Sequence, residues 1–373
     1  MAEPIGVGII GAGEISLLHA AAYRALGERV RLAAVADIEM ERAQFLADRL
    51  SIPAVHSDYQ NVLADPDVQA VSICTPPFLH VQQSVEALQA GKHVLCEKPV
   101  APTLAALDEI DAAERASGHV FSGVFQSRFG RGARQVKALI EQGRFGRLLL
   151  GFTQTLWMRD ATYYGVWWRG SWAQECGGAS VSQALHGIDM LLWLMGEPSH
   201  VYAEADTLKM DIEVEDTEAA VVRFRSGAVG QIMATVNCQD NRSRLEIYGE
   251  RLGAVSSEDA YQSTKEPFRL TAGDAAYLED VQREADELVP SEPPFLHQGM
   301  VEDFVGALEE GRQPLVTVSE CRPSLELVTG LYRSAMTGGI VRFPIEKTDP
   351  FYACIPPEGM SLPGKAPHLG RAP

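Results

Sequence analysis

The chain has 373 residues, which exceeds one core of ordinary size and predicts two domains. Apolar residues make up 46% and charged residues 22% of it, so it can bury a sizeable core and is neither disordered nor fibrous. The 32 Lys and Arg against 50 Asp and Glu give a net charge of −18, and such a surface repels nucleic-acid phosphates and anionic lipids. We therefore expect no nucleic-acid or membrane partner and favour a small molecule.

The amino-terminal residues place Glu3 where a secretory signal carries cations, and no segment reaches the ~20 uncharged apolar residues that span a bilayer. The six cysteines are scattered, without a CxxC pair or a Cys/His cluster at zinc-ligand spacing. We expect a cytoplasmic protein with reduced thiols and no structural metal.

The first third of the chain alternates short β-rich runs with amphipathic segments of helix length, which is typical of a parallel sheet with right-handed crossovers. The expected strands are 5–10, 31–36, 70–74, 93–96 and 119–125. The expected helices are 16–26, 40–50, 79–90 and 104–117. Residues 1–125 are therefore predicted to form a doubly wound, Rossmann-type α/β domain.

Beyond a linking helix at 132–142, the pattern changes to long strands and tight turns. The expected strands are 148–157, 201–210, 217–224, 228–236 and 245–248, with an apolar helix at 181–195 and a late helix near 300–308. This pattern predicts that residues 126–361 form an α+β domain with a large, mostly antiparallel open sheet, which binds substrate. Its helices are too few to cover both sheet faces, so we expect a homodimer or homotetramer. Residues 362–373 are predicted to be a flexible tail.

The segment GVGIIGAGEIS at residues 6–16 has the form of a strand followed by a dinucleotide-binding turn. Gly11 permits the tight turn and Gly13 lets the backbone approach a pyrophosphate at a helix N-terminus, while Ser16 stands where a third glycine is common. Asp37 follows the second strand, near the spacing of a carboxylate that accepts both ribose hydroxyls. That carboxylate repels a 2′-phosphate, which favours NAD over NADP; the alternative is that Asp37 caps the next helix.

Two later strands also end in polar residues, at the edge where such sheets bind ligands. Thr75 follows the strand expected at 70–74 and either caps the next helix or contacts the cofactor. Lys98 follows the strand expected at 93–96, next to the place of a nicotinamide. Desolvation and the positive charge of NAD⁺ disfavour its ammonium form, so it can take the proton of a substrate hydroxyl. The alternative is a surface lysine before a turn proline.

At these residues the sequence resembles the Gfo/Idh/MocA oxidoreductase family. The motifs that carry the resemblance are the glycine turn, Thr75-Pro76-Pro77 with His80, Glu97-Lys98-Pro99, Trp168-Arg169-Gly170, His186-Gly187-Ile188-Asp189, Asp303-Phe304 and Pro314-Leu315-Val316. Together they span nearly the whole chain. The resemblance implies a Rossmann domain joined to an α+β domain, and an oligomer.

The resemblance also implies roles for individual residues. Lys98 is then the catalytic lysine, and His186 acts as an acid/base or substrate-orienting group beside it. The implied cofactor-binding residues are Gly11, Gly13, Glu14, Ile15, Asp37, Thr75, Pro76, His80, Glu97, Lys98 and Gln126. The implied substrate-binding residues are Arg128, Trp168, Arg169, Ser182, Gln183 and His186. Glu97 would help to hold Lys98 or the cofactor.

One position departs from the family pattern. Many members carry Asp four residues before the histidine, where this chain has Ser182, followed by Gln183. A serine cannot carry charge or relay a proton as a carboxylate does. The sequence resembles the sub-branch with an amide or small polar residue here, which includes oxidoreductases of nucleotide-linked sugars and other glycosides. Ser182 and Gln183 would then bond sugar hydroxyls.

Two further pairings stay open at this point. Asp189 lies at i+3 from His186 and either orients its ring or makes a purely structural hydrogen bond. Arg169 pairs either with a substrate phosphate or carboxylate, or with an acidic neighbour such as Glu175.

The sequence as a whole predicts NAD-dependent oxidation of a secondary ring hydroxyl of a sugar, glycoside, nucleotide sugar or cyclitol to a ketone. One alternative is a hydrolase or lyase that retains NAD and cleaves a glycosidic bond by transient oxidation. Another is a non-catalytic regulator that senses NAD or a sugar. The presence of both Lys98 and His186 argues against the regulator, because a sensor needs no proton acceptor there.

Overall fold

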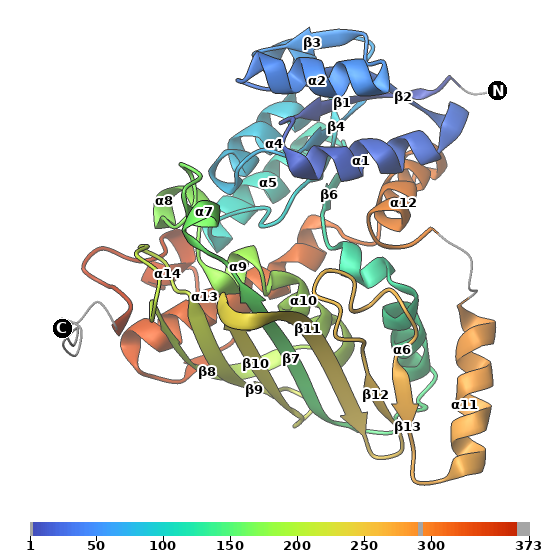
Figure 1. The fold of residues 1–373 in the computed structure, drawn as a ribbon, viewed down its shortest axis with the longest axis vertical. Helices are drawn as coiled ribbons and strands as arrows, with labels where there is room; N and C mark the ends of the chain where they lie inside the picture. The colour runs from blue at the N-terminus through green and yellow to red at the C-terminus, as the bar shows by residue number, and fades with distance from the viewer. Residues whose placement is uncertain (1–2, 290–293, 364–373) are drawn as a thin grey trace. The chain divides into compact units, whose positions relative to one another are not determined.

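The computed structural model describes residues 3–289 and 294–363, which form two compact units (Figure 1). Unit 1 comprises residues 1–126 and 294–322, and unit 2 comprises residues 127–293 and 323–373. The first boundary agrees with the predicted one. The prediction of a single domain over 126–361 is wrong, however, because residues 294–322 return to unit 1.

Unit 1 is built on a six-stranded sheet, parallel throughout, in the order β3-β2-β1-β4-β5-β6. The strands are β1 (Ile5–Ile10), β2 (Val30–Ala36), β3 (Ala54–His56), β4 (Ala70–Ile73), β5 (His93–Cys96) and β6 (Phe121–Gly123). The order reverses between β1 and β4, and the crevice at such a reversal is where doubly wound sheets bind ligands. The predicted Rossmann fold is confirmed; β3 was not predicted, and the strand expected at 119–125 is shorter.

The helices of unit 1 follow the predicted amphipathic segments closely. They are α1 (Glu14–Ala25), α2 (Met40–Leu50), α3 (Gln60–Ala64), α4 (His80–Gln89), α5 (Leu104–Ser117) and, from the returning segment, α12 (Leu296–Glu310). Helix α12 packs against α1 and carries the fully buried Phe304. Arg29 lies within 3.3 Å of Glu302 and 2.6 Å of Glu309, so ion pairs also join this helix to the rest of unit 1.

Unit 2 contains an eight-stranded sheet in the order β13-β12-β11-β7-β10-β9-β8-β14. The strands are β7 (Leu148–Met158), β8 (Pro198–Asp206), β9 (Thr217–Phe224), β10 (Val229–Thr235), β11 (Asn237–Gly249), β12 (Gly253–Val255), β13 (Arg269–Thr271) and β14 (Val341–Arg342). Only the β7–β10 pair is parallel among the described strands of this sheet. The predicted mostly antiparallel sheet is therefore confirmed.

The helices of unit 2 differ more from the prediction. They are α6 (Arg131–Glu141), α7 (Ala161–Tyr164), α8 (Trp172–Glu175), α9 (Ala179–Ser182), α10 (Leu185–Met195), α11 (Ala275–Leu288) and α14 (Pro350–Ala353), with α13 (Val318–Thr337) crossing the unit boundary. The single helix predicted at 181–195 is wrong, since the chain breaks at Gln183 between α9 and α10. Helices α11 and α13 were not predicted, and α13 carries Pro323 in its second turn.

Helix α10 lies very close to one face of the sheet. A Cβ on Gly187 would lie 2.3 Å from Thr153 Oγ1, and one on Gly151 would lie 2.7 Å from Leu191 Cδ1. The glycines thus allow α10 to approach β7 closely. On the opposite face, Tyr202, Val221, Gln231 and Phe152 are consecutive register partners, and Val221 is 54% exposed.

The predicted tail begins inside the fold. Leu362 is only 5% exposed and packs in one cluster with Ala205 and Ala335, so the expectation of a flexible segment is wrong for this residue. Residues 364–373 lie outside the described part of the chain. Among the helices of residues 3–289 and 294–363, none has the length and apolar character to cross a bilayer.

Candidate functional site

The turn between β1 and α1 leaves room for a pyrophosphate. Gly11 has a φ of 93°, and a Cβ there would lie 2.8 Å from the carbonyl carbon of Cys74, so only glycine fits. Gly13 caps α1, and a Cβ on it would meet no atom within 4 Å, which shows open space before the helix N-terminus. Glu14 and Ile15 form the first turn of α1 beside that space. These residues fit a bound NAD.

Asp37 lies against the same turn. Its Oδ2 accepts a hydrogen bond from the backbone N–H of Ala12 at 2.7 Å, and its Oδ1 accepts one from Glu39 N–H at 2.8 Å. The residue that caps α2 is Glu39, so the alternative of Asp37 as that helix cap is wrong. The carboxylate is placed beside the dinucleotide turn, as recognition of a ribose requires.

The loop after β4 is tied to the loop after β5. Thr75 does not cap a helix; its hydroxyl donates to Gln83 Oε1 at 2.6 Å, and Pro76 follows it as the cap of a short 3₁₀ turn. His80 is 1% exposed, and its ring nitrogens lie 2.7 Å from Pro99 O and 2.8 Å from Thr75 O. The ring of His80 therefore holds the two loops together with almost no exposed surface, and its role toward the cofactor stays a prediction.

Glu97 shapes the turn that carries Lys98. Its carboxylate is buried; Oε1 lies 2.9 Å from His19 Nε2, and Oε2 accepts from the backbone N–H of Lys98 at 3.1 Å. Burial acts to raise the pKa of Glu97, but the hydrogen bond and charge of His19 outweigh it and lower the pKa to about 2. Both oxygens of Glu97 therefore have protein partners, and its role toward the cofactor stays a prediction. Lys98 itself is half-buried, just beyond the carboxyl end of β5.

His19 was not predicted as a site residue. Ser16, His19, Ala20 and Tyr23 are the buried residues on one stripe of α1, at the i, i+3, i+4 and i+7 spacing of a core-facing helix side. A histidine in such a stripe needs polar partners, and that signal was present in the sequence.

Arg128 has an internal partner in unit 2. It is 3% exposed, and its Nε and Nη2 donate to the Asp189 carboxylate at 2.9 and 2.7 Å. Ser324 also donates to Asp189, at 2.9 Å. This bidentate pair uses the Arg128 fork inside the fold, and the role of Arg128 toward substrate stays a prediction. Of the two alternatives for Asp189, orienting the His186 ring or making purely structural hydrogen bonds, these contacts are of the structural kind.

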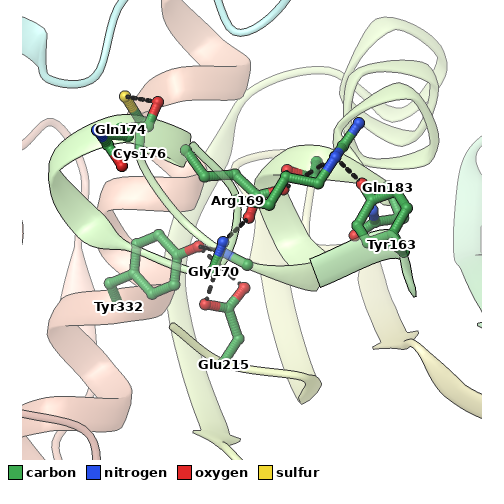
Figure 2. A network of polar contacts seen from close by, with 11 residues as sticks. Tyr163, Arg169, Gly170, Gln174, Cys176, Gln183, Glu215 and Tyr332 are labelled. Atoms are coloured by element: carbon green, nitrogen blue, oxygen red, sulfur yellow. Dashed lines mark hydrogen bonds and ion pairs between the residues drawn. The ribbon is translucent and has the colours of Figure 1, made fainter. Parts of the chain in front are cut away.

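Arg169 lies in an aromatic and acidic network that Figure 2 shows. Its guanidinium is 3.8 Å from the ring centroid of Tyr163 and 4.2 Å from that of Trp168, and it donates to the Tyr163 hydroxyl. Its Nη1 also lies 3.2 Å from Glu175 Oε1. Of the partners considered for Arg169, a substrate anion or an acidic neighbour, the structure shows the acidic neighbour Glu175, which is 1% exposed.

Glu175 also reaches the position where the family often has Asp. Ser182 donates to Glu175 Oε1 at 2.6 Å, and Gly170 N–H donates to Oε2 at 2.6 Å. Gln183 donates to the Tyr163 hydroxyl at 2.8 Å. His186 lies half-buried in the first turn of α10, three residues beyond Gln183. A carboxylate is therefore present at Ser182, supplied by Glu175.

A second buried carboxylate, Glu215, fixes the segment before α9. It accepts from the N–H groups of Gly178 at 3.0 Å and Ser180 at 2.9 Å. It also accepts from the Tyr332 hydroxyl at 2.9 Å (Figure 2). Burial raises the pKa of Glu215 to about 7. The sequence offered no signal for it, because its partners lie far away along the chain.

The site residues fall into two groups. Unit 1 carries the dinucleotide turn, Asp37, Thr75, Pro76, Lys98 and, at its end, Gln126. Unit 2 carries Trp168, Arg169, Ser182, Gln183 and His186. The first group holds the dinucleotide turn and a lysine amine, and the second holds hydroxyl, amide and imidazole groups.

Comparison with known proteins agrees with this division. Residues 5–125 match the model of an oxidoreductase family with an NAD-binding Rossmann fold, and residues 133–255 match the Gfo/Idh/MocA C-terminal domain. The chain is 32% identical to the uncharacterized oxidoreductase YrbE of Bacillus subtilis over 71% of this chain and 77% of that protein. It is 29% identical to myo-inositol 2-dehydrogenase of Thermotoga maritima, over 69% and 76% respectively.

A solved structure matches nearly the whole chain. The WlbA dehydrogenase of Bordetella pertussis, in complex with NADH and UDP-GlcNAcA, is 30% identical with a TM-score of 0.82. The match covers 92% of this chain and all of that one. A Rossmann unit with a dinucleotide turn and a lysine beyond β5 defines the class as an NAD-dependent oxidoreductase. The chain belongs to the Gfo/Idh/MocA family.

The Arg128–Asp189 pair generates a prediction about stability. Arg128→Met should lower the free energy of unfolding by about 3–5 kcal/mol, because it leaves a buried carboxylate without its cation. Arg128→Met/Asp189→Leu should recover most of that loss. Urea denaturation measures both. A large rise in KM for Arg128→Met with unchanged stability would instead return Arg128 to the substrate site.

Proposed function

We propose that the protein oxidises a secondary ring hydroxyl of a sugar, glycoside, nucleotide sugar or cyclitol to a ketone. When bound, NAD⁺ accepts the hydride from the carbon that carries the hydroxyl. Lys98 takes the hydroxyl proton, and His186 orients that hydroxyl and shares the proton. The observation that carries the proposal is Lys98 in the NAD-binding unit, its backbone held by Glu97 at the edge where a doubly wound sheet binds ligands.

The charges of unit 2 favour neutral members of this substrate class. Glu175 balances Arg169, and Asp189 balances Arg128, so neither guanidinium brings an unpaired charge to a substrate anion. Ser182 and Gln183 offer the hydroxyl and amide groups that bond ring hydroxyls. A named relative acts on myo-inositol, which is a neutral polyol. A structural neighbour was solved with UDP-GlcNAcA, so nucleotide sugars belong in the same substrate screen.

The screen also tests the reaction type. Purified protein with NAD⁺ and each candidate sugar, cyclitol, glycoside or nucleotide sugar should release one NADH per ketone formed. Glycoside cleavage without net NADH would identify the NAD-retaining reaction instead. NAD binding without turnover on any substrate would indicate a sensor.

Asp37 generates a prediction about the cofactor. NAD should be preferred to NADP by at least tenfold in kcat/KM, because a desolvated carboxylate–phosphate contact costs more than ~1.4 kcal/mol. Asp37→Ala should reduce the ratio of kcat/KM with NAD to kcat/KM with NADP. Steady-state kinetics with both cofactors measures it, and equal use of NADP by the unaltered protein contradicts the assignment.

The proton route generates a second prediction. Lys98→Met should retain NADH binding by fluorescence but lose at least ~100-fold in turnover, the scale of one acid/base group. His186→Ala should weaken both turnover and substrate binding, and Ser182→Ala should cost less than either. Lys209→Met, at an exposed position of unit 2, is the matched control. Near-normal turnover of Lys98→Met, with loss in Ser182→Ala, would require a serine-centred mechanism.

The open face of the unit 2 sheet generates a third prediction. Leu150, Val221 and Tyr202 are each at least 40% exposed there, and we infer that a second subunit covers them. Light scattering at micromolar concentration should give a dimer or tetramer. Val221→Glu should shift the protein to smaller species, whereas Leu208→Glu, exposed off this face, should not. A monomeric wild type refutes the inference.

A further inference from the structure

His19 is a buried histidine with a polar partner at each ring nitrogen. It lies on α1 with no exposed surface; Nε2 is 2.9 Å from Glu97 Oε1 and Nδ1 is 3.2 Å from Ser72 Oγ. Because an ionised carboxylate only accepts hydrogen bonds, Nε2 carries a hydrogen. The Ser72 oxygen can accept from Nδ1 as well. Both nitrogens can therefore be protonated without loss of a hydrogen bond.

The titratable groups around His19 come from four elements. Glu97 follows β5, Cys74 follows β4, and Tyr23 on α1 itself reaches His19 through the Ser72 hydroxyl, 2.9 Å away. From α12, the ring of His297 lies 6.0 Å from that of His19, centroid to centroid. Burial acts to lower the pKa of His19, but Cys74 and Glu97 outweigh it and raise the pKa to about 10. Burial lowers the pKa of His297 to about 4, so that ring stays neutral.

Glu97 in turn is coupled to Lys98. The Glu97 carboxylate is stabilised by His19 at one oxygen and by the backbone N–H of Lys98 at the other. After the opposing effect of burial, the hydrogen bond and charge of His19 lower the pKa of Glu97 more than the charge of Lys98 does. The negative charge beside Lys98 is thus already balanced within unit 1.

We propose that His19 is a positioning residue for the proton transfer: as an imidazolium it neutralises Glu97, so that this carboxylate does not hold Lys98 in its ammonium form. The inference rests on the proposed role of Lys98 as proton acceptor. Neutralisation of Glu97 favours the neutral amine of Lys98, which accepts the substrate proton.

The variant His19→Gln tests the proposal, because its amide can still donate to Glu97 but carries no charge. The ionised Glu97 should then stabilise the Lys98 ammonium and move the acidic limb of the kcat/KM profile up by about one pH unit. Below that limb kcat/KM should fall about tenfold, with little change on the alkaline plateau. His19→Gln/Glu97→Gln removes both charges and should return the limb close to its wild-type position.

The control is His93→Gln, at the opposite end of β5 from Glu97. It should leave the limb in place. A loss of kcat/KM that is equal at every pH in His19→Gln, with an unmoved limb, overturns the proposal and shows a structural role alone. Lys98→Met distinguishes failure of the proposed function from failure of the role of His19. If Lys98→Met retains turnover, the proposed function is wrong. If Lys98→Met loses turnover but the acidic limb of the kcat/KM profile does not move in His19→Gln, only the role of His19 is wrong.

A measurement on the unaltered protein covers the case in which His19→Gln does not fold. With ¹⁵N-labelled histidine, one imidazole should keep both nitrogens protonated at pH 8, and Glu97→Gln should abolish that signal. If every imidazole of the wild type is neutral at pH 8, the proposal is wrong.

Discussion

Hydrogen bonds from backbone N–H groups to carboxylates hold the loops that carry the candidate functional residues. Each such loop lacks the repeating partners of a helix or strand, so its N–H groups need other acceptors. The pairs are Asp37 with Ala12, Glu97 with Lys98, Glu175 with Gly170, and Glu215 with Gly178 and Ser180. A charged acceptor makes a stronger bond than a neutral one, and it fixes the loop before any ligand arrives.

Burial of these carboxylates would be costly if each had no cation. Glu97 has His19, Glu175 has Arg169 and Asp189 has Arg128, and each acid of these pairs is at most 7% exposed. In the described part of the chain Glu215 accepts hydrogen bonds from N–H and O–H groups and has no cation beside it, so burial raises its pKa. Two buried glutamates therefore have pKa values shifted in opposite directions: that of Glu97, beside His19, is lowered, and that of Glu215 is raised.

Much of unit 1 could be predicted because its signals are local. The glycine turn, the strand before Asp37 and the helix at 40–50 each depend on residues adjacent in sequence, and the structure keeps their bounds. The break at Gln183 was not predicted, because the apolar residues around it are those of one continuous helix. The pairing of Arg128 with Asp189 likewise needs two segments 61 residues apart to meet. Composition and periodicity carry no information on that distance, so the sequence left both residues among functional candidates.

The return of residues 294–322 to unit 1 has a consequence for the order in which the protein can be made. Synthesis proceeds from the amino terminus, so the first 126 residues leave the ribosome long before α12 is available to cover α1. During that interval the side of α1 that packs against α12 is open to water, and the intervening unit emerges while that side is still uncovered. Chaperone capture, or a slow rate of translation through the intervening unit, would matter more for this chain than for one whose domains are continuous in sequence.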